Sequence, residues 1–250
     1  MKISTVTVCH NAHATIARTV QSFLQQDHSD KELLVIDGGS TDGTVEAVKA
    51  FDSPHIRLIS EKDHGIYDAM NKGLANFSGD AVGFLNADDI YHDSSVLTRI
   101  AQNLESADAV YGDLIMVSDH TTGHVVRTWH AGEFVPGSFR TGWMPPHPTF
   151  YVRRELAART GAFDLSYRIS ADYDFMLRAL EAQHPRVRHI PHPLVDFMMG
   201  GISTTGPAAV IRGNLECLRA RRRHLGTPVL DAALFMKPLR KLRQLAWRKT

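Results

Sequence analysis

Cysteine is scarce in this sequence, and long apolar runs are absent. Only two cysteines occur among the 250 residues, Cys9 and Cys217, and they lie far apart. A disulfide scaffold is therefore not expected, and a reducing cytosol suits the composition better. No run reaches the ~18 apolar residues of a membrane span, and the N-terminal segment lacks the apolar core and cleavage site of a signal peptide. We therefore expect a cytoplasmic protein.

Motifs of two large enzyme classes are missing as well. There is no Walker loop and no G-x-S-x-G sequence, which argues against kinase-like and hydrolase functions. No internal repeat or low-complexity tract occurs. The apolar fraction of 43% is ordinary for a globular protein, and the length suits one large domain or one domain with an appendage.

Charge is divided unevenly along the chain, although the net charge is only +1. Residues 207–250 carry eleven Lys or Arg and two Asp or Glu, so the other 206 residues carry 17 basic and 25 acidic side chains, a balance of −8. Within the basic tail, 215–225 and 234–248 mix Leu, Phe and Trp with clustered Arg and Lys. One hypothesis is attachment to an anionic membrane surface, and the alternative is two packed helices with solvated basic faces. The acidic clusters of the other part argue against nucleic-acid binding.

Apolar periodicity divides the first half of the chain into alternating strands and helices. Strands are expected at 3–9, 32–36, 56–60 and 81–85, and helices at 14–26, 45–51, 67–77 and 94–104. The second half is less regular, with strands or a hairpin at 110–117 and 125–129, a Pro-rich loop at 142–149 and a helix at 170–180. The alternation predicts an α/β protein with a mostly parallel sheet flanked by helices. In such sheets ligands bind beyond the carboxyl ends of the strands.

Adjacent carboxylates follow the fourth strand, at Asp88 and Asp89. They repel each other and lose hydration unless a cation lies near them. A divalent cation bound to a diphosphate fits this position, and oxygen ligands favour Mg²⁺ or Mn²⁺. The alternative is a helix N-terminus stabilised by acidic side chains.

Other polar residues also follow predicted strands. Asp37, after the second strand, is a candidate to bind a nucleobase or ribose, although a plain turn with a helix cap would look similar. In the stretch 61–73, Asp63 could contact a base or ribose and Lys72 a phosphate, or both could lie on a solvated helix face.

A candidate general base lies in the sequence SADYD at 170–174. Transfer to a hydroxyl needs a carboxylate that takes its proton. Asp172 and Asp174 point about 200° apart on a helix, so only one of them is expected to face the substrate. His147, among prolines, is a candidate phosphate contact or supplementary metal ligand, although most of the fourteen histidines are expected to be structural or on the surface.

These motifs resemble those of the large family 2 of inverting glycosyltransferases, which have the GT-A fold, and they occur in the same order along the chain. The matching pieces are Cys9-His10-Asn11, VIDGGSTDGT at 35–44, SEKDHGIYDAMNKG at 60–73, FLNADD at 84–89 and SADYD at 170–174. The sequence is most similar to the bacterial branch from exopolysaccharide, colanic-acid-like and glycolipid assembly clusters. That branch resembles this chain in IYDAMNKG, in the His147 region and in the MGGIST sequence at 199–204.

The resemblance implies a role for each matching residue. Asp172 would be the general base, and Asp89 would hold Mg²⁺ or Mn²⁺. The nucleotide sugar would contact Val8, Asp37, Asp63, Asn71, Lys72, Asp88 and His147. Two positions depart from the family pattern. Ala171 replaces an acid before Asp172, which leaves Asp174 as a backup for the general base. Gly38 replaces a second aspartate, which affects how the nucleobase is held.

The resemblance predicts a GT-A, Rossmann-like domain over 1–206, with a nucleotide-sugar-binding half at 1–115, an acceptor-side half at 116–206 and a basic helical extension at 207–250. The expected function is inverting transfer from a nucleotide sugar to an acceptor hydroxyl, with a lipid-linked saccharide as the expected acceptor. The location expected for such an enzyme is the cytoplasm or the cytosolic face of the inner membrane. Two alternatives stay open: a non-catalytic nucleotide-sugar-binding or accessory subunit, and a nucleotidyltransferase, although the Gly-rich basic N-terminal signature of the latter is missing.

Overall fold

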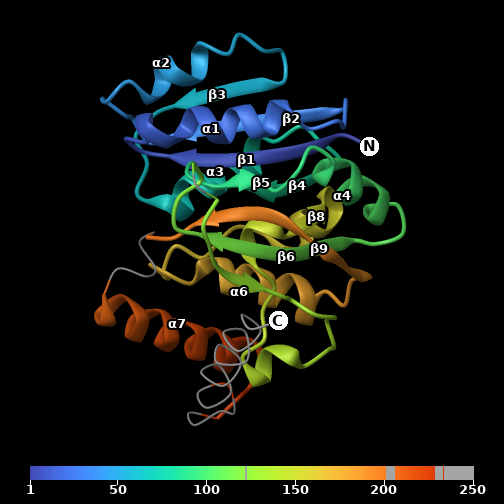
Figure 1. Cartoon of the computed structure of the whole chain (residues 1–250). Helices are drawn as coiled ribbons and strands as arrows, with labels where there is room; N and C mark the ends of the chain where they lie inside the picture. Colours follow the sequence, from blue (N-terminus) through green and yellow to red (C-terminus); the bar gives the residue numbers. More distant parts are fainter. Residues whose placement is uncertain (122, 201–205, 229–232, 234–250) are drawn as a thin grey trace.

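The computed structural model describes residues 1–121, 123–200, 206–228 and 233. Helices and strands alternate through the first half of the chain, as the periodicity predicts (Figure 1). The strands are β1 Ile3–Cys9, β2 Lys31–Asp37, β3 Ile56–Ser60, β4 Ala81–Phe84, β5 Ile90–Tyr91, β6 Ala109–Val117, β7 Val125–Trp129, β8 Tyr151–Arg153 and β9 Val187–Met198. The α-helices are α1 His13–Leu24, α2 Thr44–Lys49, α3 Ile66–Asn76, α4 Val96–Leu104, α5 Arg154–Thr160, α6 Ala171–Leu177 and α7 Pro207–Leu225. Short 3₁₀ turns, η1 Ser138–Thr141 and η2 His147–Thr149, precede β8, and a π-helical turn, η3 Arg178–Ala182, follows α6.

The nine strands of the described residues form one mixed sheet in the order β3-β2-β1-β4-β8-β6-β9-β5, with β7 paired to β6. Strands β1 to β4 are mutually parallel, and β9 is parallel to β6. β8 runs antiparallel between β4 and β6, so β4 and β6 point the same way. The expected mostly parallel sheet is therefore confirmed. The carboxyl ends of β1, β2 and β4 lie at one edge, where the acidic motifs begin.

Both faces of the sheet are buried, because side chains along a strand alternate between its two sides. Val6 of β1 faces one side and Ile3 the other. Helices α3, α5, α6 and α7 cover the first side, and α1, α2 and α4 cover the second. Gly73 lets α3 lie close to β1, because a Cβ at residue 73 would lie 2.4 Å from Cγ1 of Val6.

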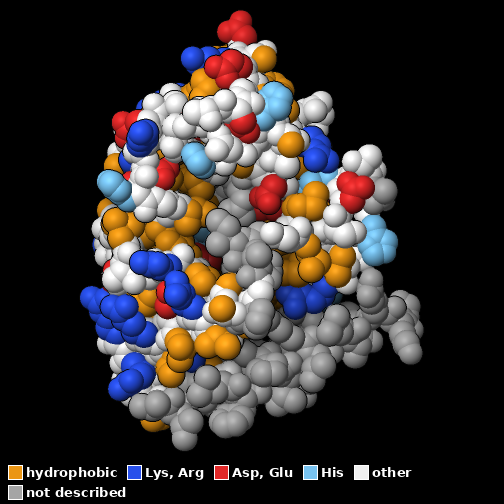
Figure 2. Space-filling view, turned by 90° about the vertical axis from the view of Figure 1, so that its left-hand side faces the viewer, with side chains coloured by type: hydrophobic (Ala, Val, Ile, Leu, Met, Phe, Trp, Pro, Cys, Tyr) orange, Lys and Arg blue, Asp and Glu red, His pale blue; other side chains and the backbone are white. Residues whose placement is uncertain are grey.

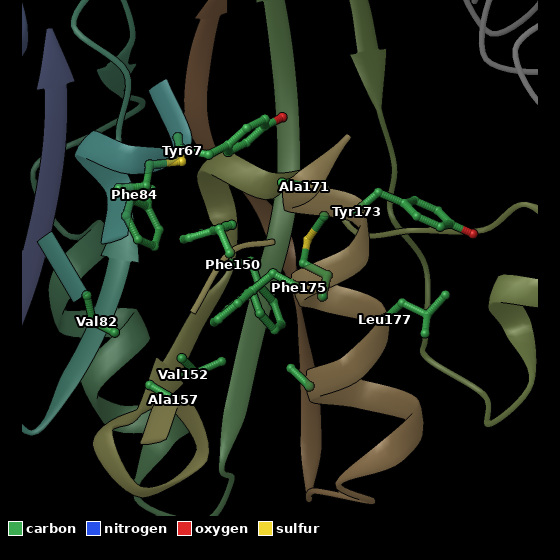
Figure 3. Close-up of a cluster of buried hydrophobic side chains, with 14 of the residues drawn as sticks. Tyr67, Val82, Phe84, Phe150, Val152, Ala157, Ala171, Tyr173, Phe175 and Leu177 are labelled. Carbon is green, nitrogen blue, oxygen red and sulfur yellow. The ribbon is translucent and has the colours of Figure 1, made fainter. Parts of the chain in front are cut away.

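Aromatic side chains fill the space between the sheet and α6 (Figure 3). Phe84 of β4 meets Phe163 edge to face at 5.3 Å between ring centroids, and Phe163 stacks on Phe175 of α6 at 4.6 Å. Tyr173 points from the other side of α6 (Figure 3). The cluster fixes α6, which carries Asp172, against the strand that leads into Asp88 and Asp89.

A buried chain of hydroxyl groups ties the short strand β8 to two strands that do not pair with it in the sheet, β5 and β1. The hydroxyl of Tyr151 in β8 lies 2.5 Å from that of Tyr91 in β5, and Tyr91 lies 2.6 Å from Oγ1 of Thr5 in β1. The three residues are fully or almost fully buried. Because buried hydroxyls need partners, these bonds link β8 to β5 and β1 in addition to its backbone pairing with β4 and β6.

The second half of the chain contains elements that the sequence pattern does not predict. The antiparallel pairing of β6 and β7 fits the hairpin expected from the sequence, but β8, β9 and α5 are not predicted, and neither is β5 in the first half. The boundary expected between residues 115 and 116 falls inside β6, so the two halves share one sheet.

The basic segment begins as helix α7, which packs on α6 (Figure 1). Cys217 and Ala220 of α7 are buried in the cluster that α6 helps to form. No helix in the described part of the chain is both long and apolar enough to cross a membrane. The second basic segment, 234–248, lies outside the described residues.

Candidate functional site

Asp37 ends β2 and is fully buried. Its carboxylate accepts hydrogen bonds from the hydroxyl of Ser40, from Oγ of Ser60 at 2.7 Å and from the backbone N–H of Gly39 at 3.1 Å. Burial raises the pKa of Asp37, but the hydrogen bonds from Ser40 and Ser60 outweigh it and hold the pKa below its ordinary value. Asp37 therefore stays ionised and holds the loop after β2 in shape.

Asp63 lies against the loop after β2, beside Gly38. A Cβ at residue 38 would lie 2.6 Å from Oδ2 of Asp63, so only glycine leaves room for this carboxylate. Oδ1 of Asp63 accepts a hydrogen bond from the N–H of Gly65 at 3.0 Å. The glycine that departs from the family motif thus makes space for Asp63, and an aspartate at 38 would add a second repelling charge there. Val8 of β1 is in register with Ile36 of β2 and is buried.

Two further candidates on α3 hold neighbouring segments together. The side-chain amide of Asn71 donates to the carbonyl oxygen of Phe163 at 3.0 Å and accepts from its N–H at 2.8 Å. The ammonium group of Lys72 donates to the carbonyl oxygen of Lys62 at 2.8 Å and pairs with Glu61 at 3.0 Å. Both side chains are engaged with protein groups, so their contact with a nucleotide sugar stays a prediction.

The carboxylates after β4 lie in different surroundings. Asp89 is fully buried and accepts hydrogen bonds from Nδ2 of Asn86 at 2.7 Å and from the N–H of Met198 at 2.9 Å. Burial and the charge of Asp88 hold the pKa of Asp89 well above its ordinary value, and burial also raises the pKa of half-buried Asp88. The carbonyl oxygen of Asp88 lies 2.8 Å from Nε2 of His120.

Raised pKa values at two adjacent carboxyls mean that negative charge is costly here. A divalent cation would remove that cost, so Asp88 and Asp89 fit such a group chemically. In the residues that the structure describes, no cluster of three or more His, Cys, Asp or Glu could hold a metal ion. The protein would therefore supply one or two carboxylates, and phosphate and water oxygens the rest, which is the usual way in which Mg²⁺ is bound beside a diphosphate.

His147 is buried among aromatic rings near Asp172. Its ring stacks on Phe84 at 5.4 Å and meets Phe163 edge to face at 6.1 Å between centroids. Burial lowers the pKa of His147, and the charge of Asp172 only partly opposes this shift. A neutral imidazole thus forms part of the wall beside Asp172, and its contact with phosphate or metal stays a prediction.

Asp172 and Asp174 point to different partners, as expected from their two-residue spacing. Half-buried Asp172, in the first turn of α6, has Oδ1 3.3 Å from the hydroxyl of Tyr67. Asp174 is 1% exposed and contacts Nε of Arg178 at 2.8 Å and Nε2 of His224 at 2.9 Å. Because Asp174 is held in this buried ion-pair network, it is unsuited to act as a backup base.

Sequence reasoning assigned no role to Tyr67, although it lies inside the IYDAMNKG motif. Its hydroxyl donates to the carbonyl oxygen of Ile169 at 2.5 Å as well as approaching Asp172. Burial and the charge of Asp172 raise the pKa of Tyr67, so the hydroxyl keeps its proton at neutral pH. Tyr67 thus connects α3, next to Asp63, with the start of α6.

Sequence comparison covers most of the chain. The family model of Glycosyl transferase family 2 matches residues 4–165. A PGL/p-HBAD biosynthesis glycosyltransferase from Mycobacterium bovis is 32% identical over 203 residues, which cover 78% of this chain and 76% of that protein. An uncharacterized glycosyltransferase from Mycobacterium tuberculosis is 30% identical over 225 residues, which cover 86% of this chain and 81% of that protein.

Solved structures share the fold at low sequence identity. S. aureus TarS, residues 1–349, aligns with a TM-score of 0.65 and 18% identity over 89% of this chain, which spans 66% of that structure. The mannosyltransferase PcManGT from Pyrobaculum calidifontis, solved with GDP-Man and Mn²⁺, aligns with a TM-score of 0.69 and 18% identity over 98% of this chain and 72% of that one. The fold is thus the GT-A fold, and with the family model covering well over half of its residues, this chain belongs to Glycosyl transferase family 2.

Proposed function

We propose that this protein transfers a sugar from a nucleoside-diphosphate sugar to a hydroxyl group of an acceptor. The observation that carries the proposal is the placement of acids in a family 2 chain. Asp63 and Asp88–Asp89 follow β3 and β4 at the carboxyl edge of the sheet, and Asp172 opens the helix packed against β4. Structures of the same fold bind UDP, UDP-GlcNAc or GDP-Man, which supports a nucleotide-sugar donor.

The donor would bind over the loop formed by Gly38 and Asp63. Asp63 is half-buried, and only one of its oxygens accepts a backbone hydrogen bond, so the carboxylate can still bind a base or ribose. Asp37 would support this loop rather than give its own saturated carboxylate to the ligand. Lys72 would reach a phosphate only by leaving Glu61, an exchange of one anionic partner for another.

Mg²⁺ or Mn²⁺ would be held by Asp89 with Asp88 beside it. When bound, the cation offsets the charge that develops on the leaving diphosphate. Asn86 and Met198 donate hydrogen bonds that fix the Asp89 carboxylate in one orientation, in which it would hold the cation.

Asp172 would remove the proton of the acceptor hydroxyl. Direct attack on the anomeric carbon, opposite the leaving diphosphate, would invert the configuration in a single displacement. Asp172 suits this role because its surroundings are partly open, whereas Asp174 is closed off by Arg178 and His224. The neutral ring of His147 would exclude water behind it.

The proposed acceptor is a lipid-linked saccharide at the cytosolic face of the inner membrane. One support is the printed name of the M. bovis relative, which refers to PGL/p-HBAD biosynthesis. Another is the outer face of α7, where Ile211 and Leu215 are each 60% exposed and lie among arginines. An open depression of ≈ 660 Å³ there is lined in part by Leu215, Arg219 and Arg222. Figure 2 shows Lys and Arg side chains gathered with hydrophobic ones at the level of α7.

The outer face of α7 combines what an anionic lipid surface recognises: apolar side chains for the interface and cations for the head groups. Its inner face packs on α6, which carries Asp172. Attachment through α7 would therefore bring a lipid-linked acceptor close to the general base.

The decisive experiment measures nucleoside diphosphate release from a panel of UDP-, GDP- and dTDP-sugars, with Mn²⁺ or Mg²⁺ and a lipid-linked acceptor extract. Metal-dependent release from one donor, abolished by Asp89→Ala and strongly reduced by Asp172→Asn, is the expected result. Release of pyrophosphate instead would favour a nucleotidyltransferase. Silence across the panel, with no thermal shift on adding any donor, would favour a non-catalytic accessory subunit.

A further inference from the structure

Three backbone N–H groups in a row point at one carboxylate just before α6. Glu216 of α7 accepts hydrogen bonds from the N–H of Arg168 at 3.1 Å, of Ile169 at 2.9 Å and of Ser170 at 2.9 Å. The hydroxyl of Ser170 adds a bond to the carbonyl oxygen of Gly213 at 3.1 Å. The loop that ends two residues before Asp172 is therefore fixed by α7, a helix more than forty residues further along the chain.

The same loop is held from the opposite side by α3. The hydroxyl of Tyr67 donates to the carbonyl oxygen of Ile169, whose N–H is bound by Glu216. Ile169 is thus bonded at both backbone polar groups, one to α7 and one to α3. The backbone position from which Asp172 projects is set by these two contacts together.

Other residues of α7 also dock the helix. Cys217 and Ala220 bury the inner face of the helix, and its second half is anchored by His224 on Asp174 and by Arg221, whose guanidinium donates to the hydroxyl of Tyr173 at 3.1 Å. Within the described residues, the hydrogen-bond partners of the Glu216 carboxylate all lie in the loop 168–170. Hydrogen bonds to an ionised acceptor are shorter and stronger than neutral ones, which suits a group that has to fix backbone position.

We propose that Glu216 is a positioning residue for proton removal: it holds the loop 168–170 so that Asp172 meets the acceptor hydroxyl in the right place. This inference rests on the proposed role of Asp172 as general base. The expected effect is one of position, because a displacement of about 1 Å at a reacting group can lower the rate about 100-fold.

The test combines Glu216→Ala with Asp172→Asn, singly and together, and uses the full chain with Mn²⁺ and the donor found active in the panel. We expect Glu216→Ala to lower kcat by about 100-fold, while binding of UDP–Mn²⁺ or GDP–Mn²⁺, measured by thermal shift, stays unchanged. In the Asp172→Asn background, Glu216→Ala should cause no further loss, because its effect acts through Asp172. Glu216→Gln, which keeps the volume and one acceptor oxygen, should fall between wild type and alanine and serves where alanine does not fold.

Asp108→Asn is the matched control. The Asp108 carboxylate also accepts a backbone N–H, from Arg186 at 2.9 Å, but at the opposite edge of the sheet, before β6 and β9 begin. A folded Glu216→Ala or Glu216→Gln protein with wild-type kcat would overturn the proposal. So would a Glu216→Ala defect that multiplies the Asp172→Asn defect in full. If Asp172→Asn itself keeps wild-type transfer, the assignment of the base fails first, and that result is distinct from the other two.

Discussion

Replacing Gly38 with alanine tests whether Asp63 contacts the nucleotide. The new Cβ would lie 2.6 Å from Oδ2 of Asp63, about 0.8 Å inside the 3.4 Å at which ordinary contact begins. Gly38 has no left-handed φ, and the clashing atom ends a flexible side chain, so Asp63 can turn away. We therefore expect the free energy of unfolding to change by less than about 1 kcal/mol.

Nucleotide affinity should respond much more strongly than stability. If Asp63 accepts a hydrogen bond from the base or ribose, turning it away removes a bond to a charged group worth about 1.5–3 kcal/mol. The Kd for UDP–Mn²⁺ or GDP–Mn²⁺, measured by calorimetry, should then rise roughly 10- to 150-fold. Asp63→Ala serves as the control, and adding Gly38→Ala to it should change nothing further. An unchanged Kd in a folded Gly38→Ala protein would refute a nucleotide contact at Asp63.

Three further perturbations test other parts of the molecule. Asp174→Asn removes the charge that Arg178 and His224 share, so the free energy of unfolding in urea should fall by about 3–5 kcal/mol. Asp108→Asn is the control: because its partner Arg186 is exposed, the free energy of unfolding should fall by less than about 1 kcal/mol. Equal decreases for the two variants would contradict the reasoning. Burial opposes ionisation of Glu32, but hydrogen bonds from Ser4, Ser78 and Arg57 lower its pKa from 4.5 to about 2. The stabilisation that ionised Glu32 contributes is therefore present above pH 4.5 and is lost as the pH falls towards 2. Glu32→Gln should flatten the decline of Tm between these two pH values, and a decline as steep as that of the wild type would contradict this prediction. Replacing Arg212, Arg219 and Arg222 with glutamine should weaken binding to anionic liposomes, measured by flotation, by about 3 kcal/mol, roughly 100-fold. The same replacement at the exposed Arg18, Lys49 and Arg99 of α1, α2 and α4 should leave this binding unchanged. Equal effects of the two triple replacements would exclude α7 as the lipid-binding face.

Periodicity predicts β1 to β4 because each shows a strand pattern, such as the alternating β-branched residues of β1 and the short apolar run of β2. It does not reveal β9, because Pro191 and Pro193 interrupt the pattern of that strand. The structure accommodates them through register shifts against β6 next to Gly112 and Asp113, where Asp113 lies opposite Pro193. β8 has three residues and β5 has two, too few to display an alternation.

The candidate site divides in a similar way. The order of the motifs places Asp63, Asp89 and Asp172 at the ends of their elements, because that placement depends on local sequence. What surrounds each acid depends on residues far along the chain, such as His224 beside Asp174. Local patterns carry no information about such pairs, and for the same reason the sequence does not reveal that Glu216 binds the backbone of 168–170.

The position of β8 has a consequence for how substrates reach the site. This strand joins β4 to β6, and Tyr151 ties it to β1 and β5 through buried hydroxyls. The two sides of the site therefore cannot swing apart about a hinge without breaking the sheet. Access for the donor and escape of the product have to come from the loops that follow the carboxyl ends of the strands. Turnover in this chain is thus expected to follow the motion of loops over a rigid sheet.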